Sequence, residues 1–385
     1  DLPYGEMKPR ERVLAALAHQ ETDRVPADLW AVPEVWQRLS AHLGLTRREI
    51  LRQFRVDARW VFPQYVGPVK ELPGGVVQDA YGHLRRSHQH DYGSYSEYAG
   101  YPLAFARTAQ DVYDWDWPQP TYWDPSNLAA ELADLDREDD YFICYDLGGI
   151  FERSWGLLGF ERFLSDLVEN PEVPAAIMER MTDLYIGNFQ RVMEATDGRV
   201  DMVYTWDDIA HQQGLLLSPA MWRRSILPHH QRLNRVLHAA PVKHMYHSCG
   251  AVFTIMGALI QELGIDVLNP LQPAAKGMDM GRIKAEHGAS VSFHGGVDIQ
   301  NTLPKGTPQA VADEVRSRCE VLGAGGGYIL APSHYIQNDT PTENILRCTA
   351  RRAIRTHNEF WRNVCPLQNC AFCLLVSPGC LTGCT

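Results

Sequence analysis

The chain has 385 residues, enough for one large domain or two ordinary ones, because single hydrophobic cores stop growing at about 250–300 residues. Hydrophobic residues make up 45% and charged residues 22%, which are globular values and exclude a largely disordered chain. The net charge is −11 and no run of Lys and Arg occurs, so neither nucleic acid nor an anionic membrane is an expected partner. No stretch approaches the roughly 18 apolar residues of a transmembrane helix, and the opening residues lack the apolar segment of a secretory signal.

The nine cysteines are unevenly distributed along the sequence. Four are scattered through the body of the chain: Cys144, Cys249, Cys319 and Cys348. A disulfide scaffold would spread its cysteines through the fold, so we expect the body to be a reduced, cytoplasmic enzyme. The other five crowd into residues 365–385, which we expect to be a Cys-rich tail outside a single domain at 1–364. For this tail we favour a non-native extension over an iron–sulfur cluster or a structural zinc site.

The part of the chain before residue 140 is predicted to combine helices, two strands and an insertion. The segment MKPRERVLAALAHQ places apolar residues on one face of a helix and forms an amino-terminal helical extension. The apolar run RVPADLW and residues 56–66 are the first two expected strands, separated by two helical patterns. Residues 71–103 alternate in polarity and are rich in Gly, Tyr and His, which predicts a β-hairpin inserted outside the main repeat.

From residue 140 onward, strand-like and helical patterns alternate. Six apolar runs are each followed by a helical pattern: YFICYDL, VDMVYTW, VKHMYHS, DVLNP, ASVSFHGG and GYILAPSH. With the two earlier units they make eight, which predicts an α/β fold of the (β/α)₈ TIM-barrel type. A doubly wound sheet is the alternative, and the lack of a G-x-G-x-x-G motif after any strand weakens it.

Chemistry in such a barrel is expected at the carboxyl ends of the strands. The sharpest signal there is His247-Ser248-Cys249, because alternate side chains of an extended segment point the same way and both are preferred zinc ligands. His334, at the end of the last predicted strand, is the natural third ligand, and Asp208 is a fourth ligand or a supporting group. The alternative is a buried histidine beside an ordinary core cysteine.

Other polar and aromatic residues at the predicted strand ends are further candidates. Asp207 and Asp208 are candidate catalytic groups, with a solvated loop pair as the alternative, and His294 is a third. The substrate-binding candidates are Asp146, Trp155, Tyr204, Trp206 and Asp298. The aromatic ones could stack on a ring-containing substrate, although barrel cores and rims also use such residues. Asp298 could instead begin a helix, with Gly295-Gly296 giving a turn.

Several segments, in order, resemble the uroporphyrinogen decarboxylase superfamily. They include MKPRERVLAALAHQETDRVPADLW, GLLGFERFLSDLVENPE, KHMYHSCG and GGYILAPSHYIQNDTPTENI. The likeness runs from about Met7 to His357 and implies a (β/α)₈ barrel, in agreement with the count of units. The superfamily holds two chemistries: metal-free decarboxylation of uroporphyrinogen, and zinc-dependent methyl transfer to or from a corrinoid.

The resemblance is nearer to the methyltransferase and O-demethylase branch. Its pattern is H-x-C after one strand and a cysteine after the last, which His247 and Cys249 match while His334 replaces the final cysteine. The decarboxylase has an arginine-containing motif after its first strand, whereas this chain has no arginine there before Arg38. The resemblance therefore implies a Zn²⁺ enzyme that moves a methyl group between a small methyl ether or thiol and a corrinoid (cobalamin) carried by a partner protein. A porphyrin-pathway decarboxylase and a non-catalytic binding subunit are the alternatives, and the sequence is compatible with a homodimer.

Overall fold

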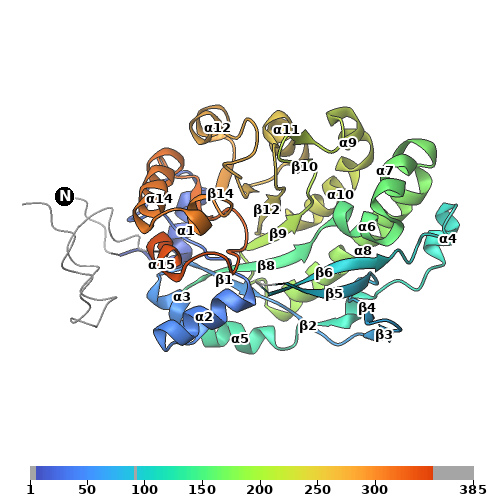
Figure 1. Cartoon of the computed structure of the whole chain (residues 1–385), viewed down its shortest axis with the longest axis horizontal. Helices are drawn as coiled ribbons and strands as arrows, with labels where there is room; N and C mark the ends of the chain where they lie inside the picture. Colours follow the sequence, from blue (N-terminus) through green and yellow to red (C-terminus); the bar gives the residue numbers. More distant parts are fainter. Residues whose placement is uncertain (1–5, 91–92, 350–385) are drawn as a thin grey trace, which may run out of the picture.

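The structure, a computed structural model, describes residues 6–90 and 93–349 and is built around a curled parallel sheet of seven strands (Figure 1). The strands are, in spatial order, β1 (Ala58–Val61), β8 (Phe142–Gly148), β9 (Met202–Trp206), β12 (Lys243–His247), β13 (Val267–Asn269), β14 (Ser292–Val297) and β15 (Tyr328–Pro332). Each overlaps a run that the sequence predicts as a strand, and β8 and β14 extend one residue beyond their runs. Sequential strands are neighbours and parallel, so their carboxyl ends share one edge of the sheet.

The run RVPADLW, predicted as the first strand, is not a strand of this sheet. It is a bridging segment that contacts the two edges of the sheet. Ala27 forms an isolated parallel bridge with Leu330 of β15, and its carbonyl accepts a hydrogen bond of 2.9 Å from the N–H of Asp57, just before β1. Pro26 has no N–H to donate, which limits a longer ladder at this position. The sheet is therefore seven-stranded and curled, as in a TIM-like barrel, and closure by an eighth strand stays a prediction.

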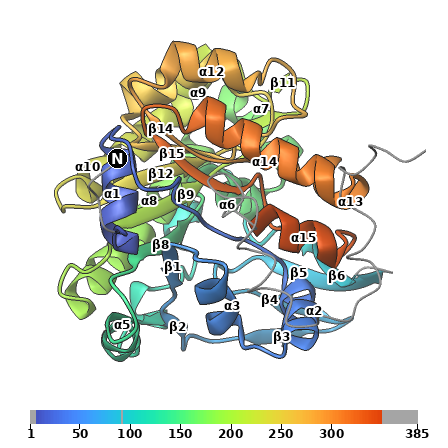
Figure 2. The same ribbon diagram turned by 90° about the vertical axis from the view of Figure 1, so that its left-hand side faces the viewer.

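Most helices lie around the outside of the sheet (Figure 2), whereas α1 packs against its inner face. Those before β9 are α1 (Pro9–Leu17), α2 (Pro33–Leu43), α3 (Arg47–Gln53), α4 (Ala109–Tyr113), α5 (Leu128–Asp136), α6 (Ile150–Leu158), α7 (Phe160–Glu169) and α8 (Glu172–Ala195). Those after β9 are α9 (Pro219–Ser225), α10 (Leu227–Leu237), α11 (Phe253–Ala258), α12 (Met280–His287), α13 (Thr302–Lys305), α14 (Pro308–Leu322) and α15 (Thr342–Thr349). Several helices begin at a capping residue followed by a proline, a pattern typical of helix starts. In α14, for example, the Thr307 side chain accepts the N–H of Ala310, and the first residue of the helix is a proline.

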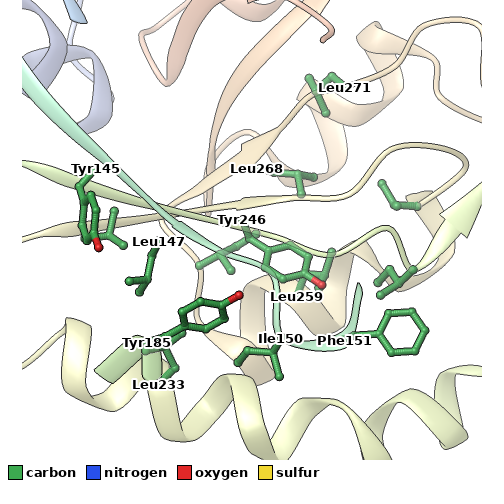
Figure 3. Packing of buried hydrophobic residues seen from close by; sticks show 14 of the residues in the cluster. Tyr145, Leu147, Ile150, Phe151, Tyr185, Leu233, Tyr246, Leu259, Leu268 and Leu271 are labelled. Carbon is green, nitrogen blue, oxygen red and sulfur yellow. The ribbon is translucent and has the colours of Figure 1, made fainter. Parts of the chain in front are cut away.

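Two apolar clusters fill the two faces of the sheet. On the outer face, strand residues such as Tyr246 and Leu268 pack with residues of the surrounding helices, among them Tyr185 and Leu233 (Figure 3). The inner face is filled by a smaller cluster of residues from the strands, from α1 and from the segment before α2. Its members are Ala58, Phe142, Cys144, Met202, Tyr204, Met245, Val267 and Ile329, with Val13, Leu17 and Trp30. These side chains fill the interior of the curled sheet and leave no room there for a substrate. We therefore expect a site at the carboxyl-end edge, among the polar residues that follow the strands.

The inserted region lies where the sequence predicts it, but it has more strands than the predicted hairpin. It is a four-stranded antiparallel sheet of β3 (Lys70–Leu72), β4 (Val76–Gln78), β5 (Leu84–His90) and β6 (Gly93–Gly100). The buried His83 beside β5 joins this sheet to α6 through a 2.8 Å hydrogen bond between its Nε2 and the carbonyl of Arg153. The Cys-rich segment 365–385 and the predicted boundary at 364 lie outside the described residues. Within the described part of the chain, no helix is both long and apolar enough to cross a membrane.

Candidate metal centre

Three ligand-type side chains meet at the carboxyl ends of β12 and β15. His247 ends β12, Cys249 follows it by two residues, and His334 lies in the loop after β15. One nitrogen of each imidazole and the Cys249 sulfur all lie within 4.8 Å of one another, and Cys249 Sγ is 3.4 Å from His247 Nε2. Zinc bonds of about 2.0 and 2.3 Å at a tetrahedral angle place two ligands about 3.5 Å apart. The structure thus brings together the three residues that the sequence predicts as metal ligands.

Asp208 adjoins this triad and holds one of its members in place. Its Oδ1 accepts a 2.8 Å hydrogen bond from the backbone N–H of Cys249 and lies 3.5 Å from His247 Nε2. The side chain remains 46% exposed, so the carboxylate is also open to solvent or to a bound molecule. Asp208 therefore occupies the position expected of a fourth ligand or of a carboxylate that supports the ligands.

The electrostatics of the triad favour a positive charge at His247 and a neutral ring at His334. Burial alone would lower the pKa of His247, but the Cys249 sulfur and the Asp208 carboxylate raise that pKa well above its ordinary value. Burial and the nearby His247 lower the pKa of His334 to about 4, so this imidazole is neutral at neutral pH. Two imidazoles, a thiol and a carboxylate are the donor set that zinc prefers. The residues present fit a zinc ion.

Aromatic side chains and Asp146 surround the triad on the side of β9. The Tyr204 ring lies 5.8 Å from that of His247, and the Trp30 ring lies 5.3 Å from Tyr204. The indole N–H of Trp206 donates a 3.1 Å hydrogen bond to Asp146 Oδ1. Tyr204, Trp206 and Asp146, which the sequence predicts as substrate contacts, therefore lie beside the triad at the carboxyl ends of β8 and β9.

Asp207, predicted as a catalytic group, is fully buried and caps a helix. Its carboxylate accepts hydrogen bonds from the backbone N–H groups of residues 150–152, which open α6, at 2.7–3.1 Å. Its Oδ2 also lies 2.6 Å from His230 Nε2. With these four partners, the observed role of Asp207 is to fix α6 against the end of β9.

Three other predicted residues lie apart from the triad. Trp155 of α6 packs against Tyr98 of the inserted sheet, with ring centroids 5.1 Å apart. Asp298 accepts the backbone N–H groups of Gln300 and Asn301 in the loop before α13, and the N-cap of that helix is Asn301, so Asp298 does not itself begin the helix. His294 is fully buried and is linked to His247 of the triad through Asn269.

Comparison with known proteins places the chain in a family. A family model described as Uroporphyrinogen decarboxylase (URO-D) matches residues 147–353, more than half of the 385 residues, and the match includes His247, Cys249 and His334. The chain belongs to the uroporphyrinogen decarboxylase family. This confirms the superfamily that its sequence segments resemble. No curated protein sequence matches the chain.

Solved structures support the fold of this family member. A methyltransferase from Methanosarcina mazei superimposes with a TM-score of 0.65 over 91% of this chain and 99% of that chain, at 18% identity. Likeness at that identity establishes the fold alone. Dihydropteroate synthase from Anaplasma phagocytophilum (19% identity, 43% of this chain and 65% of that chain) and the YdhT protein from Bacillus subtilis (8%, 86% and 93%) reach TM-scores of only 0.28 and 0.39 and carry no argument.

One acidic residue beside the site in this uroporphyrinogen decarboxylase family member is absent from the sequence-based candidates. Glu152 lies in the first turn of α6, and burial together with the negative charges of Asp208 and Asp207 raises its pKa to about 7. Burial also raises the pKa of Asp146 to about 6. The only sequence signal for Glu152 is its place after β8, since a residue just past a strand end belongs to the same rim.

We predict that the metal-free family member loses stability as the pH rises from about 5 to 8. The pKa of Glu152 in the folded state, about 7, lies above its ordinary value of 4.5, so the folded state binds this proton more tightly than the unfolded state. Stability from this group is complete below its ordinary pKa and is lost as the pH passes the raised one. One pKa unit corresponds to about 1.4 kcal/mol, so the loss from Glu152 is on the order of 3 kcal/mol.

Urea unfolding at pH 5 and pH 8 checks this expectation. The variant Glu152→Gln should remove much of the fall in unfolding free energy between the two values. A matched control is Glu262→Gln, because Arg223 holds the pKa of that exposed carboxyl below its ordinary value. An unchanged pH dependence in the Glu152 variant would contradict the raised pKa.

Proposed function

We propose that this chain is a zinc-dependent methyltransferase that moves a methyl group between a small methyl ether or thiol and the corrinoid of a partner protein. The observation that carries the proposal is the meeting of His247, Cys249 and His334 at the carboxyl-end edge of the sheet. Membership of the uroporphyrinogen decarboxylase family leaves decarboxylation and methyl transfer as the candidate reactions. A fold shared with a protein described as a methyltransferase supports methyl transfer. A cytoplasmic location fits the proposal, because Cys249 must stay reduced to act as a ligand.

His247, Cys249 and His334 would hold the zinc ion, with Asp208 as a fourth ligand or as support for Cys249. When bound, zinc supplies a Lewis acid that stabilises negative charge on the oxygen or sulfur from which, or to which, the methyl group moves. A set of two histidines and one cysteine places less negative charge on zinc than a set with two thiolates. This favours an ether oxygen over a thiol as the atom at the metal.

The remaining residues would orient the substrate and handle its proton. Tyr204 and Trp206 offer ring faces beside the triad against which a small organic group can pack. Glu152, with a pKa of about 7, can exchange a proton near neutral pH, as a leaving alkoxide or an entering thiol requires. Asp207 would act indirectly, by fixing the start of α6 that carries Glu152.

A methyl-transfer assay tests the proposal directly. The zinc-loaded protein is mixed with a reduced corrinoid protein and a panel of methyl ethers, and formation of methyl-corrinoid is followed by absorbance. Transfer that disappears in Cys249→Ser supports the proposal. Bound zinc without transfer to or from any corrinoid would leave a binding subunit as the better description, whereas absence of a metal site would remove the proposed chemistry.

We predict no conversion of uroporphyrinogen III to coproporphyrinogen by this chain. A substrate with many carboxylates needs cationic partners for each buried charge, and no arginine follows the bridging segment before Arg38. The Arg38 guanidinium is itself engaged, since it donates to the backbone carbonyls of Asn338 and Thr340 at 3.0 and 2.5 Å. Chromatography of the reaction products checks this expectation, and detection of coproporphyrinogen would restore the decarboxylase alternative.

A further inference from the structure

A continuous chain of hydrogen bonds runs behind the triad and ends on one of its histidines. It links Asp28 of the bridging segment, His294 of β14, Asn269 of β13 and His247 of β12. Asp28 Oδ2 is 3.2 Å from His294 Nε2, His294 Nδ1 is 2.6 Å from Asn269 Nδ2, and Asn269 Oδ1 contacts His247 Nδ1. All four residues are buried, none being more than 4% exposed.

The direction of these hydrogen bonds is determined at the Asp28 end. Asp28 Oδ2 accepts the indole N–H groups of Trp30 and Trp60 at 2.7 and 2.9 Å, and Asp28 Oδ1 accepts the backbone N–H of Leu29 at 2.7 Å. An indole N–H can only donate, so the carboxylate acts as an acceptor here. The hydrogen bonds to Asp28 also hold its pKa below the ordinary value despite burial, in keeping with an ionised carboxylate.

Each subsequent bond in the chain takes its direction from the one before. Facing the Asp28 carboxylate, His294 Nε2 must carry a hydrogen, and its Nδ1 lies 2.6 Å from the Asn269 amide nitrogen, from which it accepts. Asn269 then donates through Nδ2 and turns its carbonyl oxygen toward His247. That oxygen can only accept, so His247 Nδ1 carries a hydrogen and Nε2 is the nitrogen that faces Cys249 Sγ, at 3.4 Å.

We propose that Asp28, His294 and Asn269 are positioning residues that fix which nitrogen of His247 is presented to the metal. They would hold His247 with its hydrogen on Nδ1, orient the ring toward Cys249 and His334, and increase the basicity of Nε2 through a negative charge at the far end of the chain. The role in metal binding rests on the proposed function. The bond directions themselves do not, since they follow from the two indoles and the carboxylate.

The reverse arrangement has a clear consequence. If the Asn269 side chain were turned by 180°, its NH₂ group would face His247 Nδ1, which would then accept and leave the hydrogen on Nε2. Binding of a metal at Nε2 would then cost this hydrogen bond, because Nδ1 would have to carry the hydrogen against another donor. The hydrogens of His294 distinguish the two arrangements: only Nε2 carries one in the proposed chain, whereas Nδ1 must carry one as well in the reversed chain, because it would then face the Asn269 carbonyl oxygen.

The bond directions are tested on the metal-free full-length protein labelled with ¹⁵N-histidine. Long-range ¹H–¹⁵N spectra report which ring nitrogens of each histidine carry a hydrogen, and the His294 signals are assigned by their absence in His294→Gln. We expect a hydrogen on Nε2 of His294 and none on its Nδ1. Hydrogen on its Nδ1 would overturn the proposal whether or not the protein binds a metal.

The effect on the metal is tested by titrating Co²⁺, a spectroscopic substitute for zinc, into metal-free variants. We expect Asn269→Leu to weaken Co²⁺ binding by about 10- to 100-fold and Asp28→Asn to weaken it by a smaller factor. The matched control is Asn234→Leu, which removes a buried amide bonded to the carbonyls of Leu263 and Gly264 away from the triad. Thermal unfolding of every variant shows whether it folds. If Asn269→Leu does not fold, Co²⁺ titration of Asp28→Asn, the mildest change, still tests the proposal.

Three outcomes are informative. Weaker Co²⁺ binding in Asn269→Leu and Asp28→Asn, with unchanged binding in Asn234→Leu, supports the positioning role. Unchanged affinity in folded Asn269→Leu and Asp28→Asn overturns it. A wild-type protein that binds no Co²⁺ but shows the expected His294 hydrogen would overturn the proposed function and the metal-positioning role, and would leave only the bond directions standing.

Discussion

Replacing Cys249 with serine should weaken zinc binding by more than about a hundredfold. This loss exceeds the one expected when a residue that only hydrogen-bonds to a metal ligand is replaced. The site has three candidate ligands in addition to Asp208, so it offers little redundancy. His334→Ala should have a comparable effect, although His334 and Cys249 lie in different parts of the chain. Competition between the protein and a zinc-binding dye measures the affinities.

Cys319→Ser is the matched control for the cysteine change. Cys319 lies in α14 on the outside of the sheet and is not part of the triad, so its replacement should leave the zinc affinity unchanged. Equal affinity in the Cys249 and Cys319 variants would show that the Cys249 sulfur is not a ligand. Thermal unfolding separates loss of a ligand from loss of the fold.

Replacing Asp207 with alanine should lower the free energy of unfolding by about 3–5 kcal/mol, measured by urea titration. The substitution leaves His230 and three backbone N–H groups at the start of α6 without their acceptor in the protein interior. Asp183→Ala is the control, because the Asp183–Arg232 pair is 43% exposed on both sides and should contribute less than about 1 kcal/mol. Equal losses in the two variants would contradict the structural role of Asp207.

The sequence predicts the strands after residue 140 well, because each is a short apolar run bounded by polar residues or a glycine, and burial on both faces leaves that pattern in the sequence. The triad follows from the strands. Once parallel strands are assigned, residues just past their carboxyl ends must lie on one rim, which is why His247 and His334 meet although 87 residues separate them.

What the sequence does not reveal are roles set by long-range contacts. Asp207 and Asp208 are adjacent and chemically alike, yet one caps α6 and the other adjoins the triad, because successive side chains at a strand end point in opposite directions. Asp28 and Asn269 bear no motif, and only their placement across the sheet relates them to His247. The run RVPADLW has the composition of a strand, but its pairing depends on two sheet edges far along the chain.

X-ray absorption at the zinc edge of the purified, zinc-loaded protein tests the central claim most directly. The proposed site predicts one zinc per chain with one sulfur neighbour at about 2.3 Å and at least two nitrogen neighbours at about 2.0–2.1 Å. Cys249→Ser should remove the sulfur neighbour. A protein that retains no stoichiometric zinc, or whose zinc shows no sulfur neighbour, would contradict a metal site made by His247, Cys249 and His334.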